Sequence, residues 1–162
     1  MVVFDTNVLI WGVKRQSTSG QENMIELAVR LIEDLDDKET EIALPSLVIS
    51  EYLSNFPDES REEQYSELIR SYYIVPFDAK AASIAAKIRN DRDKISGIVD
   101  EYSASRNVIK ADIYILASAL SCGATEIFTH DKHIKKLAKG FDILVSDIPM
   151  LPPRKTQKSL LD

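Results

Sequence analysis

Short apolar runs alternate with longer amphipathic stretches along this chain. The apolar runs predict five strands, at residues 1–4, 41–44, 72–75, 126–129 and 141–145. Between them, apolar residues recur at the i, i+3, i+4, i+7 spacing that gathers them on one face of a helix. This spacing predicts helices at residues 21–35, 46–56, 60–70, 78–91, 111–121 and 130–139. A further helix is expected soon after Asn7, and residues 93–105 form either a helix of their own or an extension.

Local signals mark several helix ends. Ser46 and Asp78 are expected as N-caps, because their side-chain oxygens can accept hydrogen bonds from the free N–H groups of a first turn. Pro57 ends the helix that Ser46 opens. Gly123 suits the C-terminal cap of the helix at 111–121, which is apolar almost all round and is therefore expected to be buried.

Strands that alternate with helices predict an α/β fold, a three-layer α/β/α sandwich around a central, mainly parallel sheet. The 162 residues fit one domain. We assign this domain to residues 1–148 and interpret residues 149–162 as an irregular C-terminal tail. Ligands of parallel sheets bind beyond the carboxyl ends of the strands, so the residues that follow the strands are the candidates for a site.

Four acidic residues are expected at that edge of the sheet. Asp5 and Asp131 follow the first and fourth strands, Glu51 lies on the helix after the second strand, and Asp112 begins the apolar helix. Each has a simpler interpretation. The two strand-end residues could cap helices, Glu51 could lie on a solvated face, and Asp112 could contact the dipole of a first helical turn. Asp112 is the most informative of the four, since it is the only charged residue of the predicted helix at 111–121.

A cluster of these acids would have a definite chemical meaning. Two carboxylates about 4 Å apart repel each other by roughly 4 kcal/mol at an effective dielectric constant near 20. Three or four together are costly unless some are protonated or a cation lies between them. Oxygen ligands favour Mg²⁺ or Mn²⁺, and such ions activate water and stabilise charge at a scissile phosphate.

Charge and composition restrict the class of protein. The formal net charge is −6, with −8 in residues 1–60 and +3 in residues 130–162, which argues against nucleic-acid binding by bulk positive charge. The basic C-terminal segment is the candidate patch for such a contact. A single cysteine excludes an internal disulfide and makes a reducing compartment, the cytoplasm, the default location. No apolar run approaches the roughly 18 residues of a membrane span, so no membrane association is expected.

The acids and their surroundings resemble the PIN domain family. The resemblance rests on Phe4-Asp5-Thr6-Asn7 after an N-terminal strand, on Glu51, on Asp112 opening an apolar helix and on Thr129-His130-Asp131. It covers about residues 1–148. It implies a compact α/β/α domain and a Mg²⁺- or Mn²⁺-dependent ribonuclease. Many small stand-alone members of the family are toxins of toxin–antitoxin pairs, of the VapC type.

The resemblance also implies roles for individual residues. The acidic residues of the metal and catalytic site would be Asp5, Glu51, Asp112 and Asp131. Supporting hydrogen bonds would come from Thr6, Asn7 and Thr129. The best candidates for contacts to the RNA backbone are Lys132, Lys135, Lys136 and Lys139. A metal-activated water would attack the phosphodiester and leave a 5′-phosphate and a 3′-hydroxyl. The implied partners are an RNA substrate, a small antitoxin protein and, as is common in the family, a second copy of the chain.

Other interpretations remain open. A phosphatase of the haloacid-dehalogenase type needs a second Asp two residues after the first, where this chain has Asn7. A receiver-like phosphorylation domain needs adjacent acids near its start, and residues 1–7 hold only one. The stronger alternative is a non-catalytic PIN-like module that binds nucleic acid or protein. The stretch at 78–110 is longer than in many compact toxins, and it is expected to reshape the substrate groove.

Two histidines and a tryptophan are given structural interpretations. His130 and His133 flank Asp131 and are interpreted as surface or turn residues rather than as a catalytic base. Trp11 is interpreted as a core or interface residue rather than as a platform for base stacking.

Overall fold

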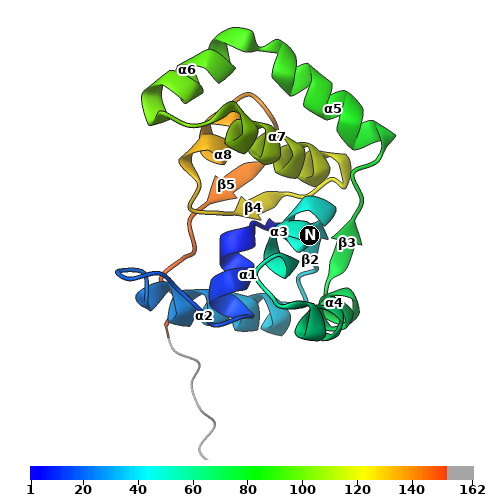
Figure 1. Ribbon diagram of the computed structural model, residues 1–162, viewed down its shortest axis with the longest axis vertical. Helices are drawn as coiled ribbons and strands as arrows, with labels where there is room; N and C mark the ends of the chain where they lie inside the picture. Colours follow the sequence, from blue (N-terminus) through cyan, green and yellow to red (C-terminus); the bar gives the residue numbers. More distant parts are fainter. Residues whose placement is uncertain (153–162) are drawn as a thin grey trace, which may run out of the picture.

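The computed structural model describes residues 1–152, which form a five-stranded sheet covered by helices (Figure 1). The strands are β1 (Val2–Phe4), β2 (Ile42–Pro45), β3 (Tyr73–Val75), β4 (Glu126–Phe128) and β5 (Leu144–Ser146). The helices are α1 (Thr6–Gly12), α2 (Asn23–Asp37), α3 (Ser46–Leu53), α4 (Asp58–Ser71), α5 (Ala79–Asn90), α6 (Arg92–Tyr102), α7 (Arg106–Ser121) and α8 (Lys132–Leu137).

All strand pairs of the sheet are parallel, in the order β3-β2-β1-β4-β5. Connections between parallel strands are right-handed, so a reversal in strand order moves the connecting helices to the other face. Accordingly α1, α2 and α4 lie on one side of the sheet, and α5, α6, α7 and α8 lie on the other (Figure 1). This arrangement confirms the predicted three-layer α/β/α sandwich.

The core lies between the sheet and these helices. The central strands contribute Phe4, Leu44 and Ile127, all fully buried. A parallel sheet that is covered on both faces needs such continuous apolar strands, which is why the short runs were recognisable in the sequence. Among residues 1–152, no helix is long and apolar enough to cross a membrane.

The N-terminal caps of α3 and α7 differ from what the sequence predicts. Helix α3 begins at Ser46 itself, after Pro45, and Ser46 does not cap it. Its hydroxyl instead donates to the Val75 carbonyl and accepts from the Phe77 N–H, which ties α3 to the end of β3. Helix α7 begins at Arg106 rather than at residue 111, because Ser105 accepts a hydrogen bond from the Val108 N–H and provides the N-cap.

Other local expectations hold or shift slightly. Asp78 caps α5 by accepting from the Ala81 N–H. Gly123 follows the end of α7 with a φ of +74°, the left-handed conformation that glycine adopts without a steric penalty. Strand β5 occupies residues 144–146 rather than 141–145. Residues 149–152 are neither helix nor strand, and the rest of the predicted tail lies outside the described residues.

The long stretch between β3 and β4 forms three helices. Helices α5 and α6 arch over the outer side of α7 (Figure 1). The end of α6 reaches α8, where Tyr102 packs edge-on against His133, with ring centroids 5.1 Å apart. The additional length therefore places α6 side chains beside the residues that follow β4.

Candidate active site

The strand order reverses between β1 and β4, and the predicted site lies at that point. The two strands are paired with Phe4 opposite Phe128, so Asp5 and Thr129 emerge side by side at their carboxyl ends. The Asp5 N–H donates to the Phe128 carbonyl at 3.2 Å, which holds the two strand ends together. Such a switch point is where open parallel sheets bind their ligands.

Asp5 is buried and fully engaged in hydrogen bonds. Its Oδ1 accepts from the Thr6 N–H at 2.7 Å, so it caps α1, and its Oδ2 accepts from the Thr129 hydroxyl at 2.6 Å. The residue has an exposed fraction of only 6%. Burial raises the pKa of Asp5 to about 6, although the hydrogen bonds from Thr129 and Thr6 oppose the shift. The capping interpretation of Asp5 is therefore correct, and it coexists with a place in the cluster.

Glu51 reaches the same edge from α3. Its Oε2 accepts a hydrogen bond from the Thr6 hydroxyl. Thr6 thus contacts one acid through its side chain and another, Asp5, through its backbone N–H. Asn7, by contrast, is exposed, and its side chain has no hydrogen bond within the described part of the chain. The support expected from Asn7 stays a prediction.

Asp112 lies in the second turn of α7, on a buried face of the helix. Because α7 starts at Arg106, Asp112 is not in a first turn, and the interpretation as a dipole contact is wrong. Its exposed fraction is 6%, and its neighbours along the helix, Ile109 and Ile113, are buried. A carboxylate in this position carries a desolvation penalty that the helix dipole does not offset.

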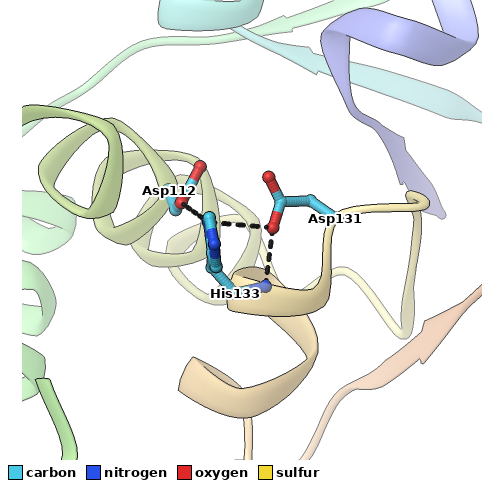
Figure 2. Close-up of side chains that lie close together, drawn as sticks. All are labelled: Asp112, Asp131 and His133. Carbon is cyan, nitrogen blue, oxygen red and sulfur yellow. Dashed lines mark hydrogen bonds and ion pairs between the residues drawn. The ribbon is translucent and has the colours of Figure 1, made fainter. Parts of the chain in front are cut away.

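Asp131 and His133 complete the cluster from the start of α8 (Figure 2). Asp131 caps α8, with its Oδ1 accepting from the His133 N–H at 2.6 Å. The His133 ring then turns back, so that its Nδ1 lies 3.2 Å from Asp131 Oδ1 and 3.2 Å from Asp112 Oδ2. One ligand atom from each of the three residues lies within 4.8 Å of the others. They form the tightest group of possible metal ligands among residues 1–152.

The four acids are joined by one series of hydrogen bonds and close polar contacts. In spatial order the series runs through Glu51, Thr6, Asp5, Thr129, Asp131, His133 and Asp112. Thr129 is its centre, because its hydroxyl donates to Asp5 and accepts from the Asp131 N–H at 2.9 Å. The side chain of Thr129 is completely buried.

The electrostatics of the cluster are unfavourable without a cation. Burial, followed by the charges of Asp131, Asp5 and Glu51, raises the pKa of Asp112 to about 8. Within residues 1–152, no lysine or arginine forms an ion pair with any of the four acids. A divalent cation among these oxygens would offset the repulsion, which is the usual reason for such a donor set in a protein.

The four candidate RNA-contacting lysines differ from one another. Lys135 pairs with Asp147 at 2.6 Å, and Lys136 pairs with Glu101 of α6. Lys132 and Lys139 are exposed and form no ion pair within the described part of the chain. Lys132 directly follows Asp131. The RNA contacts expected of the four lysines stay a prediction.

Reasoning from the sequence missed His133. Its neighbour His130 does face away, toward Asp147 at 3.1 Å, so the expected surface role suits His130 only. A signal was available, because an N-cap side chain accepts from the backbone N–H two or three positions further on, so Asp131 as an N-cap lies close to the backbone of His133. Trp11 is buried and packs edge-on against His130, as expected of a core residue.

Comparisons with known proteins bear on the family and the fold of this chain. The family model for the PIN domain matches residues 2–140. Among solved structures, the chain is similar to VapBC2 from Rickettsia felis bound to a DNA fragment from their promoter, with a TM-score of 0.61. It is also similar to DNA-bound VapBC from Salmonella typhimurium, with a TM-score of 0.59. Each likeness has 16% sequence identity and covers 91% of this chain and 98% of the other. No curated protein sequence matches the chain.

Fold and site together define a parallel α/β sandwich with an acidic cluster at its switch point. The chain belongs to the PIN domain family. The two solved structures, at this level of identity, support the fold alone.

Proposed function

We propose that this chain is a divalent-metal-dependent ribonuclease that hydrolyses RNA phosphodiester bonds. The observation that carries the proposal is the convergence of Asp5, Glu51, Asp112 and Asp131 at the switch point without a neutralising lysine or arginine in the described chain. PIN domains are typically nucleases, and oxygen-rich sites of this kind suit Mg²⁺ or Mn²⁺.

The residues of the cluster would have different roles in the reaction. Asp112 and Asp131 would hold the metal from α7 and α8, with Asp5 and Glu51 adding negative charge from the opposite side. Bound metal supplies an activated water and offsets charge at the scissile phosphate. Thr129 and Thr6 keep the carboxylates oriented, because each hydroxyl donates its proton to one of them. Asn7 would support the site by a hydrogen bond to a carboxylate, a water or the phosphate, and Lys132 would contact the RNA backbone. Products with a 5′-phosphate and a 3′-hydroxyl are expected.

Cleavage of labelled RNA by the full chain tests the proposal. Wild type, Asp112→Asn and Asp142→Asn are compared in EDTA, Mg²⁺ and Mn²⁺. Asp142 is the matched control, because it is an exposed aspartate just before β5, at the amino edge of the sheet and away from the cluster. We expect metal-dependent cleavage that Asp112→Asn abolishes and Asp142→Asn retains. A folded wild type that binds several structured and unstructured RNAs without cutting any of them would favour the non-catalytic interaction module instead.

We further propose that a small antitoxin protein covers this site. The support is the negative potential of the cluster, which would attract a basic side chain of a partner, together with the VapBC complexes among the similar structures. Expression of the chain alone should arrest growth, and co-expression with the product of the adjacent gene should relieve the arrest. Growth that is indifferent to the neighbouring gene, with wild type active in vitro, would leave a nuclease that has no antitoxin.

A further inference from the structure

His133 gives the acidic cluster one ligand that is not oxygen. Within residues 1–152, Asp112, Asp131 and His133 form a group whose possible metal-ligand atoms lie within 4.8 Å of one another, and the imidazole lies between the two carboxylates (Figure 2). Its Nδ1 is 3.2 Å from an oxygen of each. Of the two contacts, the one to Asp112 has hydrogen-bond geometry. A single N–H shared between both oxygens would form a three-centre bond that is weak to each of them, so hydrogen bonding satisfies the pair of contacts poorly.

A bound cation accounts for both contacts. Adjacent ligands of an octahedral ion with bonds of about 2.1 Å lie roughly 3.0 Å apart, close to the two observed separations. In that arrangement the Nδ1 lone pair faces the ion and the proton of the neutral ring is on Nε2. The ring is already held in place, since its own N–H on the backbone donates to Asp131 and its edge packs against Tyr102 of α6.

We propose that His133 is a nitrogen ligand of the metal site and makes the site prefer a first-row transition ion such as Mn²⁺ to Mg²⁺. The inference rests on the proposed metal-dependent function and specifies its ion. Mg²⁺ is hard, takes oxygen ligands and retains its waters, whereas imidazole is a favourable ligand for first-row transition ions. Replacing one carboxylate or water by an imidazole therefore costs Mg²⁺ more than Mn²⁺.

The test measures metal binding by the full chain without RNA, so its result does not depend on catalysis. Mn²⁺ is added to wild type, and electron paramagnetic resonance is used to detect coupling between the ion and a nitrogen nucleus. Calorimetry then gives the dissociation constants of Mn²⁺ and Mg²⁺ for wild type, His133→Asn, His133→Asp and His130→Asn. His130 is the matched control, because it follows the same strand but contacts Asp147 and the Ile148 N–H instead of the cluster.

We expect nitrogen coupling to Mn²⁺ in wild type and in His130→Asn, and none in His133→Asn. Loss of the imidazole should weaken Mn²⁺ binding at least about 10-fold, the lower end of what removing a residue that only orients a ligand costs. Mg²⁺ binding should change much less, and His133→Asp should shift the preference toward Mg²⁺.

Contrary outcomes are distinguishable. Mn²⁺ bound without nitrogen coupling in wild type would overturn the inference and leave the metal-dependent nuclease standing. Coupling that persists in His133→Asn, or that is lost in His130→Asn, would overturn it as well. No binding of either ion at millimolar concentration would overturn both this inference and the metal dependence of the proposed function.

Discussion

At the scale of single residues, hydrogen bonds from threonine hydroxyls stabilise the site, and repulsion between the buried carboxylates destabilises it. The Thr6 and Thr129 hydroxyls each donate a hydrogen bond to one of the acids, while Asp112 carries its carboxylate into an apolar helix face. The first arrangement stabilises the folded chain and the second costs it stability. The two effects can be measured separately, because they involve different residues.

Asp112 should make the metal-free protein less stable as the pH rises. Its pKa is raised from 3.8 to about 8 by burial and by the neighbouring acids, so the folded state holds a proton that the unfolded chain has released. The contribution of Asp112 to the free energy of unfolding is therefore fully present below about pH 3.8. It is lost as the pH rises through about 8. In EDTA, Asp112→Asn should gain on the order of 1–3 kcal/mol relative to wild type between about pH 5 and pH 8.5, measured by thermal unfolding.

The comparison of the two pH profiles isolates this residue, since other groups, including Asp5, titrate in both proteins. Saturating Mn²⁺ should reduce the difference, because the ion relieves the same repulsion in wild type. Parallel profiles in EDTA would show that Asp112 is not desolvated among the other acids.

Thr129 should contribute to stability through its buried hydroxyl. Thr129→Val preserves shape but leaves Asp5 Oδ2 without its donor and the Asp131 N–H without its acceptor. The expected cost is about 1–3 kcal/mol of unfolding free energy, from urea denaturation. Thr125→Val is the control, because the Thr125 hydroxyl also donates a hydrogen bond, to the carbonyl of Met1, but is exposed. Equal losses of unfolding free energy in the two variants would mean that burial of the Thr129 hydroxyl does not increase its contribution to stability.

At the scale of elements, the sequence predicts strands better than helix ends. All five strands were recognisable because a covered parallel sheet demands apolar runs, and the order of the acids followed from placing residues at strand ends. The start of α7 was missed because Ser105 lies in a polar, charged stretch that hides its role as N-cap. Strand β5 shifted by three residues at its start because Phe141 and Ile143 pack against the core without joining the strand. Helical periodicity defines faces, and hydrogen bonds that cap a helix define its ends.

The contacts that form the site depend on long-range geometry that no local pattern contains. Asp5 and Thr129 are 124 positions apart in the sequence. They meet because β1 pairs with β4 as well as with β2. The order of the acids indicated the family resemblance, and the fold implied by that resemblance contains this pairing. The His133 ring lies beside Asp112 on one side and packs against Tyr102 of α6, a helix that the sequence indicates only as additional length.

Two glycines in helices should respond in opposite ways to substitution. Gly97 lies in the middle of α6, and a Cβ added there would meet only open space, so Gly97→Ala should raise the unfolding free energy by about 0.5–1 kcal/mol. Gly12 ends α1 where α2 approaches closely, and an added Cβ would lie 2.6 Å from Ile32 Cδ1 and 3.3 Å from Ala28 Cβ. Gly12→Leu should therefore cost about 1–3 kcal/mol. Denaturant midpoints give both values, and a stabilising Gly12→Leu would show that α1 and α2 are loosely packed at this point.

At the scale of the whole molecule, the uneven distribution of charge must be reconciled with the anionic substrate that we propose. The first sixty residues carry a net charge of −8, and the acidic cluster adds to the local negative potential. Any RNA that reaches the site does so against this field, so the few cations beside it matter more than the total charge. The ion pairs of Lys135 and Lys136 leave Lys132 and Lys139 as the exposed, unpaired cations of the basic segment within the described chain.

Lys132 should therefore contribute more to RNA binding than its paired neighbours. In an Asp112→Asn background, chosen because it is expected to prevent cleavage, Lys132→Glu should weaken RNA binding several-fold. It should also reduce the slope of log affinity against log salt by about 0.7 for each lost phosphate contact to a single strand. Lys136→Glu should have a smaller effect, because Lys136 already pairs with Glu101. Lys87→Glu, an exposed substitution on α5, controls for net charge. Equal weakening by Lys132→Glu and Lys87→Glu would mean that RNA responds to the overall charge of the protein and not to a contact beside Asp131.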